Sequence, residues 1–128
     1  MWTWLQSHTI FETDVLTIHL KGVDFRMTEK RKPTYDLDAF KAAASRIRVT
    51  VVATRTAAAL GFGRAEIEAT IETMQRRQFF KSMTSYGDHR VWQDVYYVPS
   101  PAGTLYVKFT ADAVTEFVLL SFKEKDND

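Results

Sequence analysis

The chain has 128 residues, of which 45% are hydrophobic, and its 17 basic residues nearly balance its 16 acidic residues. This length predicts a single globular domain with one hydrophobic core. The sequence contains no cysteine, which excludes disulfides, thiolate metal sites and a cysteine nucleophile and fits a reducing cytoplasm. A net charge of +1 creates no strong overall field, so a polyanionic partner would have to be bound by locally placed cations.

The first 26 residues differ in character from the rest of the chain. They lack the basic start of a secretory signal, and their apolar stretch contains Glu12 and Asp14. No run approaches the roughly 20 apolar residues of a membrane-spanning helix, so no membrane association is expected. The segment from Val15 to Leu20 favours a short strand. We expect residues 1–26 to be an N-terminal extension and residues 27–128 to form the functional domain.

The first regular element predicted after the extension is a helix. Thr34 and Asp36 follow Pro33 as capping candidates, and apolar residues then recur at helical spacing as far as Ile47. The β-branched cluster at residues 49–52 is typical of a strand. A helix and then a strand are therefore expected in succession.

Two further helical pieces are predicted before the chain changes its pattern. Residues 54–60 are rich in alanine and favour one or two helical turns, which the glycines that follow would end. Ile67, Ile71 and Met74 share one face of the next predicted helix, and charged residues occupy the opposite side.

After Arg77 the hydrophobic period changes from helical to two, which predicts four consecutive strands separated by turn-forming residues. The expected strands are residues 79–85, 91–98, 104–111 and 117–123. Helices followed by strands with short connections favour an α+β domain, in which the helices cover one face of a mostly antiparallel sheet.

Polar and apolar residues alternate cleanly in the third predicted strand. Tyr106 and Lys108 share one face, while the apolar residues between and around them point to the core. In the second strand, Gln93 is an amide among apolar neighbours. These residues indicate a solvent-exposed, basic face that would suit a phosphodiester.

The first and last predicted strands each carry a lysine. Strict alternation places Lys81 on the same face as Phe79, which is unfavourable for an ammonium unless that face meets solvent or a ligand. In the last strand, alternation groups Leu119 with Lys123 and puts Phe122 on the other face. On the pattern alone, lysines that protect sheet edges and tyrosines that pack in the interior are the favoured interpretation.

The histidines give no sign of a metal site. His89 follows Asp88 in a turn, where a solvated imidazole is more common than a catalytic base. His8 and His19 lie in the extension and share no metal-ligand spacing with it. We therefore predict no metal and no cofactor.

Several blocks of the chain resemble the motility quorum-sensing regulator (MqsR) toxin family. The family signature F-[YF]-K-S-M-T-x-Y-x-D-H-x-x-W-Q-D-V-Y is similar to residues 79–96, FFKSMTSYGDHRVWQDVY. The family's ending resembles LYVKFT and LLSFKEK near the C-terminus, and its start resembles MTEKRKPTYDLDAFK from Met27. The resemblance covers Met27 to Lys125 and is weakest through the helices.

This resemblance implies a RelE-like fold and a metal-independent endoribonuclease that cuts messenger RNA at GC-containing sites. It further implies a cytoplasmic toxin of a type II toxin–antitoxin system, neutralised by a cognate antitoxin that is encoded nearby. DNA would be contacted only through the antitoxin, since the chain shows no helix-turn-helix or zinc-finger pattern. The alternative is a catalytically inactive homologue that binds RNA or the antitoxin.

The family's functional positions fall on the polar residues of the predicted strands: Lys81, Gln93, Tyr106 and Lys123. The expected reaction is attack by the substrate's own 2′-hydroxyl on the adjacent phosphorus, with the lysines stabilising charge or exchanging a proton. Tyr106 would donate a proton or anchor the substrate, and Gln93 would orient the phosphate or ribose. The second-choice catalytic or RNA-binding residues are Asp88, His89, Arg90 and Lys108.

The chain departs from the family pattern in its first 26 residues, at Tyr97, in the loop from Pro99 to Gly103, and in its acidic tail. These differences are expected to alter the RNA sequence preference or the fit of the antitoxin. Because the likeness begins at Met27, we expect that residue to be the natural start and residues 1–26 to be an over-extended reading frame.

Overall fold

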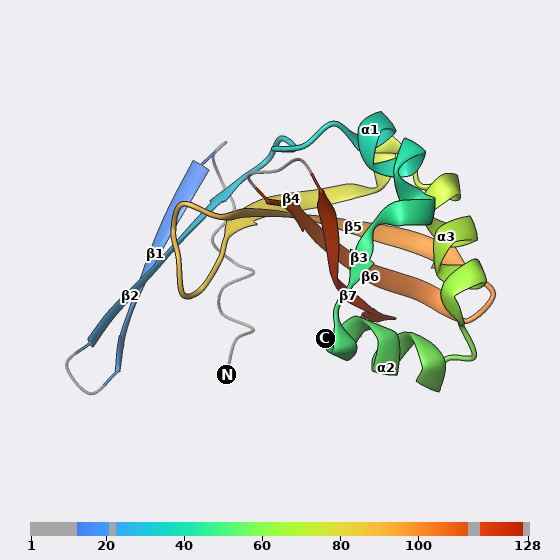
Figure 1. Cartoon of the computed structure of the whole chain (residues 1–128). Coiled ribbons are helices and arrows are strands. Elements are labelled where there is room, and N and C mark those ends of the chain that lie inside the picture. The colour runs from blue at the N-terminus through green and yellow to red at the C-terminus, as the bar shows by residue number, and fades with distance from the viewer. Residues whose placement is uncertain (1–12, 21–22, 113–115, 127–128) are drawn as a thin grey trace.

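The computed structural model describes residues 13–20, 23–112 and 116–126, and Figure 1 shows the arrangement of its elements. Its strands form one sheet in the order β1-β2-β4-β5-β6-β7-β3. The strands are β1 Thr13–Leu20, β2 Val23–Lys30, β3 Arg48–Val49, β4 Phe79–Thr84, β5 Trp92–Ser100, β6 Gly103–Ala111 and β7 Phe117–Glu124. The helices are α1 Leu37–Ala42, α2 Val51–Ala59 and α3 Arg64–Thr73, with short 3₁₀ turns η2 Ala44–Arg46 and η3 Arg76–Gln78.

The strand pairing is antiparallel throughout the described sheet except between β3 and β7, which run parallel. The expected α+β class with a mostly antiparallel sheet is therefore confirmed. Within the described ranges, no helix has the length and apolar character needed to cross a bilayer.

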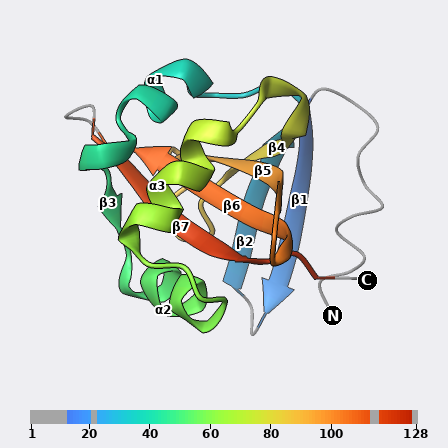
Figure 2. The same ribbon diagram turned by 90° about the vertical axis from the view of Figure 1, so that its right-hand side faces the viewer.

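One hydrophobic core joins the helices to the central strands, and Figure 2 shows α3 crossing in front of β6 and β7. Phe40 of α1 stacks on Phe109 of β6, with ring centroids 3.7 Å apart and an angle of 4° between the planes. Phe62, in the loop before α3, packs against Phe122 of β7 at 5.4 Å. Burying side chains of this size contributes about 1.5–3 kcal/mol each, so this face supplies much of the folding free energy.

The start of α1 follows from two acidic residues. The Asp36 carboxylate caps the helix by accepting a hydrogen bond from the Asp38 N–H at 3.0 Å. Thr34, the other capping candidate, instead donates its backbone N–H to the buried Asp94 carboxylate at 3.1 Å. The Tyr35 N–H binds the same carboxylate at 2.9 Å, so β5 fixes the position of the segment that enters α1.

The strand predicted at residues 49–52 is confirmed only at Val49, the last residue of β3. Val51 and Val52 form the first turn of α2 and are 65% and 64% exposed. The reason is Thr50, whose hydroxyl accepts a hydrogen bond from the Ala53 N–H at 3.1 Å and so caps a helix there. The helical turns expected at residues 54–60 are confirmed within α2, and the helix expected around Ile67 is α3.

A β-bulge corrects the predicted faces of β7. Lys108 of β6 pairs with Ser121, but the next residue, Phe109, pairs with Leu119, so Leu120 is the extra residue. Leu119 therefore lies in the core together with Phe122, and Lys123 lies on the opposite face. Strict alternation had grouped Leu119 with Lys123.

A second bulge corrects the predicted faces of β4. Phe79 pairs with Tyr96 and Lys81 pairs with the adjacent Val95, which leaves Phe80 as the extra residue. Phe79 consequently packs on the helix side against Tyr96, whereas Lys81 lies on the other face. The predicted conflict between Phe79 and Lys81 on one face does not arise.

The N-terminal part of the described chain is a β-hairpin. The two strands β1 and β2 pair along their full lengths, and Figure 1 shows the hairpin projecting from the sheet. Only the end of β2 joins β4, through the pairs Glu29 with Met83 and Lys30 with Ser82. The strand predicted at residues 15–20 is therefore confirmed as part of β1, and Glu29 is held against β4.

Candidate functional site

Five polar residues lie on the sheet face opposite the helices, and we call this surface the lysine face. They come from four neighbouring strands, which bring together positions more than 40 residues apart in the sequence. The members are Lys81 of β4, Gln93 of β5, Tyr106 and Lys108 of β6, and Lys123 of β7. Lys123 is exposed and the other four are partly exposed, so each is accessible to solvent.

Strand register fixes the order of these residues across the sheet. Lys81 and Lys108 both pair with Val95, so their Cα atoms lie two strands, or roughly 10 Å, apart. Tyr106 pairs directly with Lys123 in the next row of side chains. Lysine side chains are long enough to reach toward each other across this distance. The Lys81 and Lys108 ammonium groups can therefore contact the same bound phosphate.

Gln93 lies at the far end of the same face. It pairs with Met83, one row away from Lys81 and two rows from Lys123. The Cα atoms of Gln93 and Lys123 are therefore roughly 16 Å apart. The predicted site residues form a strip along the sheet rather than a compact pocket, and a strip suits an extended polymer.

Lys108 occupies the centre of this strip. Burial lowers its pKa most, and the positive charges of Lys123 and Lys81 lower it further. The charges of Lys81 and Lys123 therefore both reach the Lys108 ammonium in the middle of the face. The sequence made Lys108 only a second-choice site residue. Its central position makes it as strong a candidate for substrate binding or catalysis as Lys81 and Lys123.

The phenol of Tyr106 is held in its protonated form. Burial raises its pKa to about 12, and the nearby Tyr97 and the negative charges of Glu29 and Asp126 act in the same direction. At neutral pH this hydroxyl donates a hydrogen bond or a proton and does not act as a base. The Lys123 ammonium lies 5.4 Å from the centre of the Tyr106 ring, so a cation accompanies the donor.

A buried glutamate, Glu29, is bound to the lysine face through Lys81, and the sequence pattern did not mark it as a site residue. Its carboxylate oxygen Oε2 accepts a hydrogen bond from Lys81 Nζ at 2.8 Å. The pair is largely withdrawn from solvent, with side-chain exposures of 4% for Glu29 and 13% for Lys81. The one signal in the sequence was the place of Glu29 inside MTEKR, in a block that resembles the family start.

Aromatic rings border the cations on this side of the molecule. Phe80 and Tyr97 stack with centroids 4.4 Å apart, and Tyr97 approaches Tyr106 at 6.2 Å. The Lys125 ammonium lies 5.1 Å from the centre of the Tyr97 ring. Aromatic rings beside cations are the combination that binds single-stranded nucleic acid, because rings stack on bases while cations meet phosphates.

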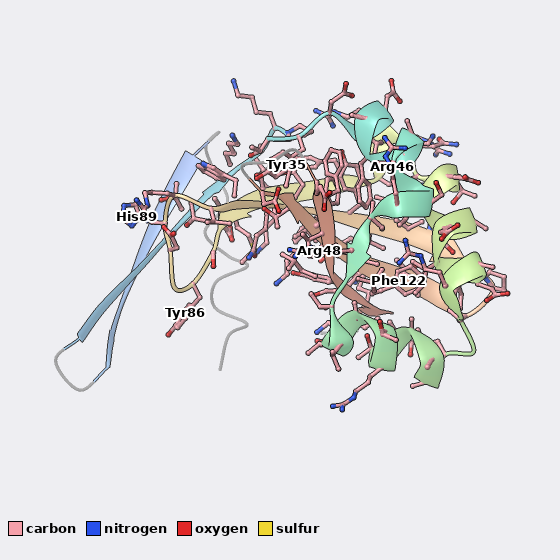
Figure 3. The ribbon with its side chains drawn as sticks, in the orientation of Figure 1. Tyr35, Arg46, Arg48, Tyr86, His89 and Phe122 are labelled. Carbon is pink, nitrogen blue, oxygen red and sulfur yellow. The ribbon has the colours of Figure 1, made fainter. Side chains whose placement is uncertain are left out.

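The turn residues Asp88, His89 and Arg90 lie on the β4–β5 loop rather than on the strands that carry the lysine face, and Arg90 lines a pocket with Thr110 and Val118. Figure 3 shows His89 and Tyr86 on the β4–β5 loop, outside the strands. Arg90 Nε donates to Asp88 Oδ1 at 3.1 Å, and this hydrogen bond is the main reason that the pKa of Asp88 is lowered. The arrangement fits a turn that is stabilised by its own ion pair.

The residues that alternate with the lysine face hold the sheet to neighbouring segments. The Ser82 and Thr34 hydroxyl oxygens lie 2.7 Å apart, and the Thr84 hydroxyl accepts a hydrogen bond from the Thr28 N–H at 2.9 Å. Asp94 is fully buried, where it anchors the segment before α1. The K-S-M-T and W-Q-D motifs thus combine candidate site residues with structural ones.

The chemistry available on this face is that of cations and hydrogen-bond donors. In the described part of the chain, no three residues of the metal-binding types come together. The three lysines can stabilise negative charge on a phosphate, Tyr106 can donate a proton, and Gln93 can donate and accept hydrogen bonds.

Two comparisons with known proteins show what this chain is similar to. The family model described as "Motility quorum-sensing regulator, toxin of MqsA" matches residues 32–124. The "mRNA interferase toxin MqsR" of Escherichia coli (strain K12) is 36% identical over 99 residues, which cover 76% of this chain and 99% of that protein. The matched range, residues 32–124, spans the positions of all five members of the lysine face. The chain therefore belongs to the motility quorum-sensing regulator (MqsR) toxin family.

Proposed function

We propose that the chain is the toxin of a type II toxin–antitoxin system and cuts messenger RNA as a sequence-selective endoribonuclease. The observation that carries this proposal is the lysine face, where Lys81, Lys108 and Lys123 share one side of the sheet with the protonated hydroxyl donor Tyr106. The name of the Escherichia coli relative, an mRNA interferase toxin, supports the same activity. RNA is the substrate class that presents both a phosphodiester and its own nucleophile.

The proposed reaction needs no metal. The 2′-hydroxyl oxygen attacks the adjacent phosphorus and its proton passes to a base, while the bond from phosphorus to the 5′-oxygen breaks and that oxygen takes up a proton. The products are a 2′,3′-cyclic phosphate and a free 5′-hydroxyl. The phosphorane between them carries more negative charge than the ground state, so catalysis requires groups that bind the added charge more tightly.

The residues of the lysine face divide these tasks. Lys81 and Lys123 stabilise the charge on the phosphorane, and Tyr106 supplies a proton or a hydrogen bond. Lys108 adds a third cation, and its lowered pKa makes it the lysine that most readily releases a proton to act as a base. Gln93, at the far end of the strip, orients the ribose or a neighbouring phosphate.

Further properties of the proposed toxin rest on family membership. We propose a RelE-like arrangement of the fold, cleavage at GC-containing sites, action in the cytoplasm, and neutralisation by an antitoxin encoded nearby. Contact with DNA would occur only through that antitoxin. Residues 27–128 would form the toxin domain, and residues 1–26 would be an extension of it.

Cleavage of a labelled RNA tests the proposal. The purified chain is incubated with an end-labelled RNA that contains several GC steps, in excess EDTA, beside a Lys81→Met variant and a matched variant of an exposed lysine, Lys32→Met. We expect cuts at GC sites by the wild type and by Lys32→Met, and a loss of roughly 10²- to 10⁴-fold in Lys81→Met. A wild-type chain that binds this RNA without cutting it would support the catalytically inactive homologue instead.

A further inference from the structure

The buried ion pair between Glu29 and Lys81 is the feature of the lysine face that the proposed reaction has not used. Its two charged groups lie 2.8 Å apart, and the Glu29 residue is only 3% exposed. A carboxylate withdrawn from water is unfavourable unless a cation or hydrogen-bond donors satisfy it. The ammonium of Lys81 supplies both, so the orientation of one side chain depends on the other.

The backbone of Glu29 is fixed to the strand that carries Lys81. Glu29 pairs with Met83 of β4, and the preceding Thr28 N–H donates to the Thr84 hydroxyl. The carboxylate therefore has a set position relative to β4. It occupies the same sheet face as Gln93, with Met83 between them.

A lysine side chain has four rotatable bonds and loses much conformational freedom when it is held in one place. Here Lys81 is restrained on two sides, by the Glu29 carboxylate and by the Phe80 ring, whose centre lies 5.3 Å from Nζ. An ammonium has three donors, so one bound to Glu29 leaves two for a phosphate. The restraint thus places the cation in advance without using up its capacity to bind substrate.

The negative charge of Glu29 also affects the electrostatics of the lysine face, which carries three lysines. Burial is the main reason that the pKa of Lys108 is lowered, and repulsion by the charges of Lys123 and Lys81 lowers it further. A carboxylate at the Lys81 end opposes this repulsion, and its field extends to Tyr106, whose pKa it helps to raise. Glu29 therefore acts on the arrangement of charges across the face.

From these contacts we infer that Glu29 is a positioning residue of the RNA-cleaving site, which acts by holding the Lys81 ammonium where the scissile phosphate binds. The inference rests on the proposed function. Glu29 does not itself meet the substrate, since its carboxylate is buried and bound to the Lys81 ammonium. Its contribution to the rate passes through Lys81.

The test is a double-mutant cycle on the full chain. Glu29→Gln removes the negative charge and keeps the size of the side chain, and Lys81→Met keeps the stem and removes the ammonium. Single-turnover cleavage of the GC-containing RNA gives the rate constant and the half-saturating enzyme concentration for each variant. Glu72→Gln, an exposed glutamate on α3, is the matched control.

We expect Glu29→Gln to lower the single-turnover rate by roughly 10- to 100-fold, because a misplaced catalytic group costs up to about 10²-fold. The half-saturating concentration should change much less, and Glu72→Gln should cut like the wild type. In the Lys81→Met background, Glu29→Gln should cause no further loss, since the group through which it acts is already absent.

Thermal unfolding separates positioning from a general structural role. Lys81→Met leaves the buried carboxylate unpaired and should lower the midpoint, and adding Glu29→Gln should restore part of that loss. A rate loss from Glu29→Gln that is equally large with and without Lys81 would overturn the inference. So would Glu29→Gln cleavage at or above the wild-type rate.

The outcome also distinguishes the inference from the function on which it rests. Wild-type chain that leaves the RNA intact would overturn the proposed function, and this inference with it. Wild-type cleavage that Glu29→Gln reproduces in full would overturn the inference alone.

Discussion

The two faces of strand β6 share one backbone and carry opposite chemistry. On the helix side, Leu105, Val107 and Phe109 are fully buried. On the other side, Tyr106 and Lys108 lie among cations and remain partly exposed. The helix side stabilises the fold through apolar contacts, whereas the lysine face accepts a concentration of like charge that opposes stability. Substitutions on one face should therefore affect stability, and substitutions on the other should affect RNA cleavage.

The largest expected effect is on catalysis, from Tyr106→Phe. The substitution keeps the ring and removes the hydroxyl whose pKa burial raises to about 12, so cleavage should fall by roughly 10²- to 10⁴-fold. The urea midpoint should stay close to that of the wild type. Tyr86→Phe, on the exposed β4–β5 loop, is the control and should cut normally. Normal cleavage by Tyr106→Phe would remove the tyrosine from the mechanism.

Phe109→Ala should lower stability and leave cleavage largely unchanged, because Phe109 is a core residue that stacks on Phe40. Emptying that space should lower the free energy of unfolding by about 3–5 kcal/mol. At a temperature where the variant is still folded, its cleavage rate should remain near that of the wild type. Val52→Ala, at an exposed position of α2, should change stability by less than about 0.5 kcal/mol. Equal urea curves for the two variants would contradict the packing described for the helix side.

Asp94→Asn should give a smaller loss of stability. The buried carboxylate accepts the backbone N–H groups of Thr34 and Tyr35, and hydrogen bonds to charged groups are worth about 1.5–3 kcal/mol. Chemical denaturation should show a loss in that range. Asp94 is adjacent to Gln93 in the sequence, so the comparison with Gln93→Ala separates the two roles. A Gln93→Ala variant should lose cleavage activity and keep its stability. Loss of stability in Gln93→Ala, together with loss of cleavage alone in Asp94→Asn, would contradict these assignments.

His89→Ala should have the smallest effect. The imidazole is exposed on the β4–β5 loop, away from the lysine face (Figure 3). Substitutions at such positions change free energies by about 0.5 kcal/mol or less, so cleavage should change by roughly twofold at most. A loss of a hundredfold in a cleavage assay would show that the loop moves onto the lysine face when RNA binds.

Sequence patterns were sufficient for the regular parts of the fold. Alternation in β6 correctly separated Tyr106 and Lys108 from the core, because β6 has no extra residue of its own. The capping candidate Asp36 correctly indicated the start of α1, and the apolar face that contains Ile67 and Ile71 correctly indicated α3. The α+β class followed from the order of these elements.

The errors have specific physical causes. The bulges at Phe80 and Leu120 reverse the faces of the residues that follow them, and alternation alone does not reveal a single inserted residue. At Val51, the β-branched preference for strands was outweighed by the Thr50 cap. Local propensity therefore failed where a tertiary or capping interaction determined the backbone.

The site was predicted less completely than the fold. Family resemblance pointed to Lys81, Gln93, Tyr106 and Lys123 as candidate site residues, but it gave no reason to expect Lys108 at their centre. Glu29 was missed because its contact with Lys81 joins residues 52 positions apart. Such a pair becomes visible only when the register of β2 against β4 is known.

Replacing one ribose in the substrate tests the central claim most directly. An RNA with a single preferred GC site is compared with the same RNA carrying a 2′-deoxyribose at the nucleotide that would supply the nucleophile. If the lysine face promotes attack by the 2′-hydroxyl, the wild-type chain should cut the first RNA to a 2′,3′-cyclic phosphate in EDTA and leave the second intact. Equal cleavage of the two RNAs would show that the nucleophile is water or a protein group and would contradict the account.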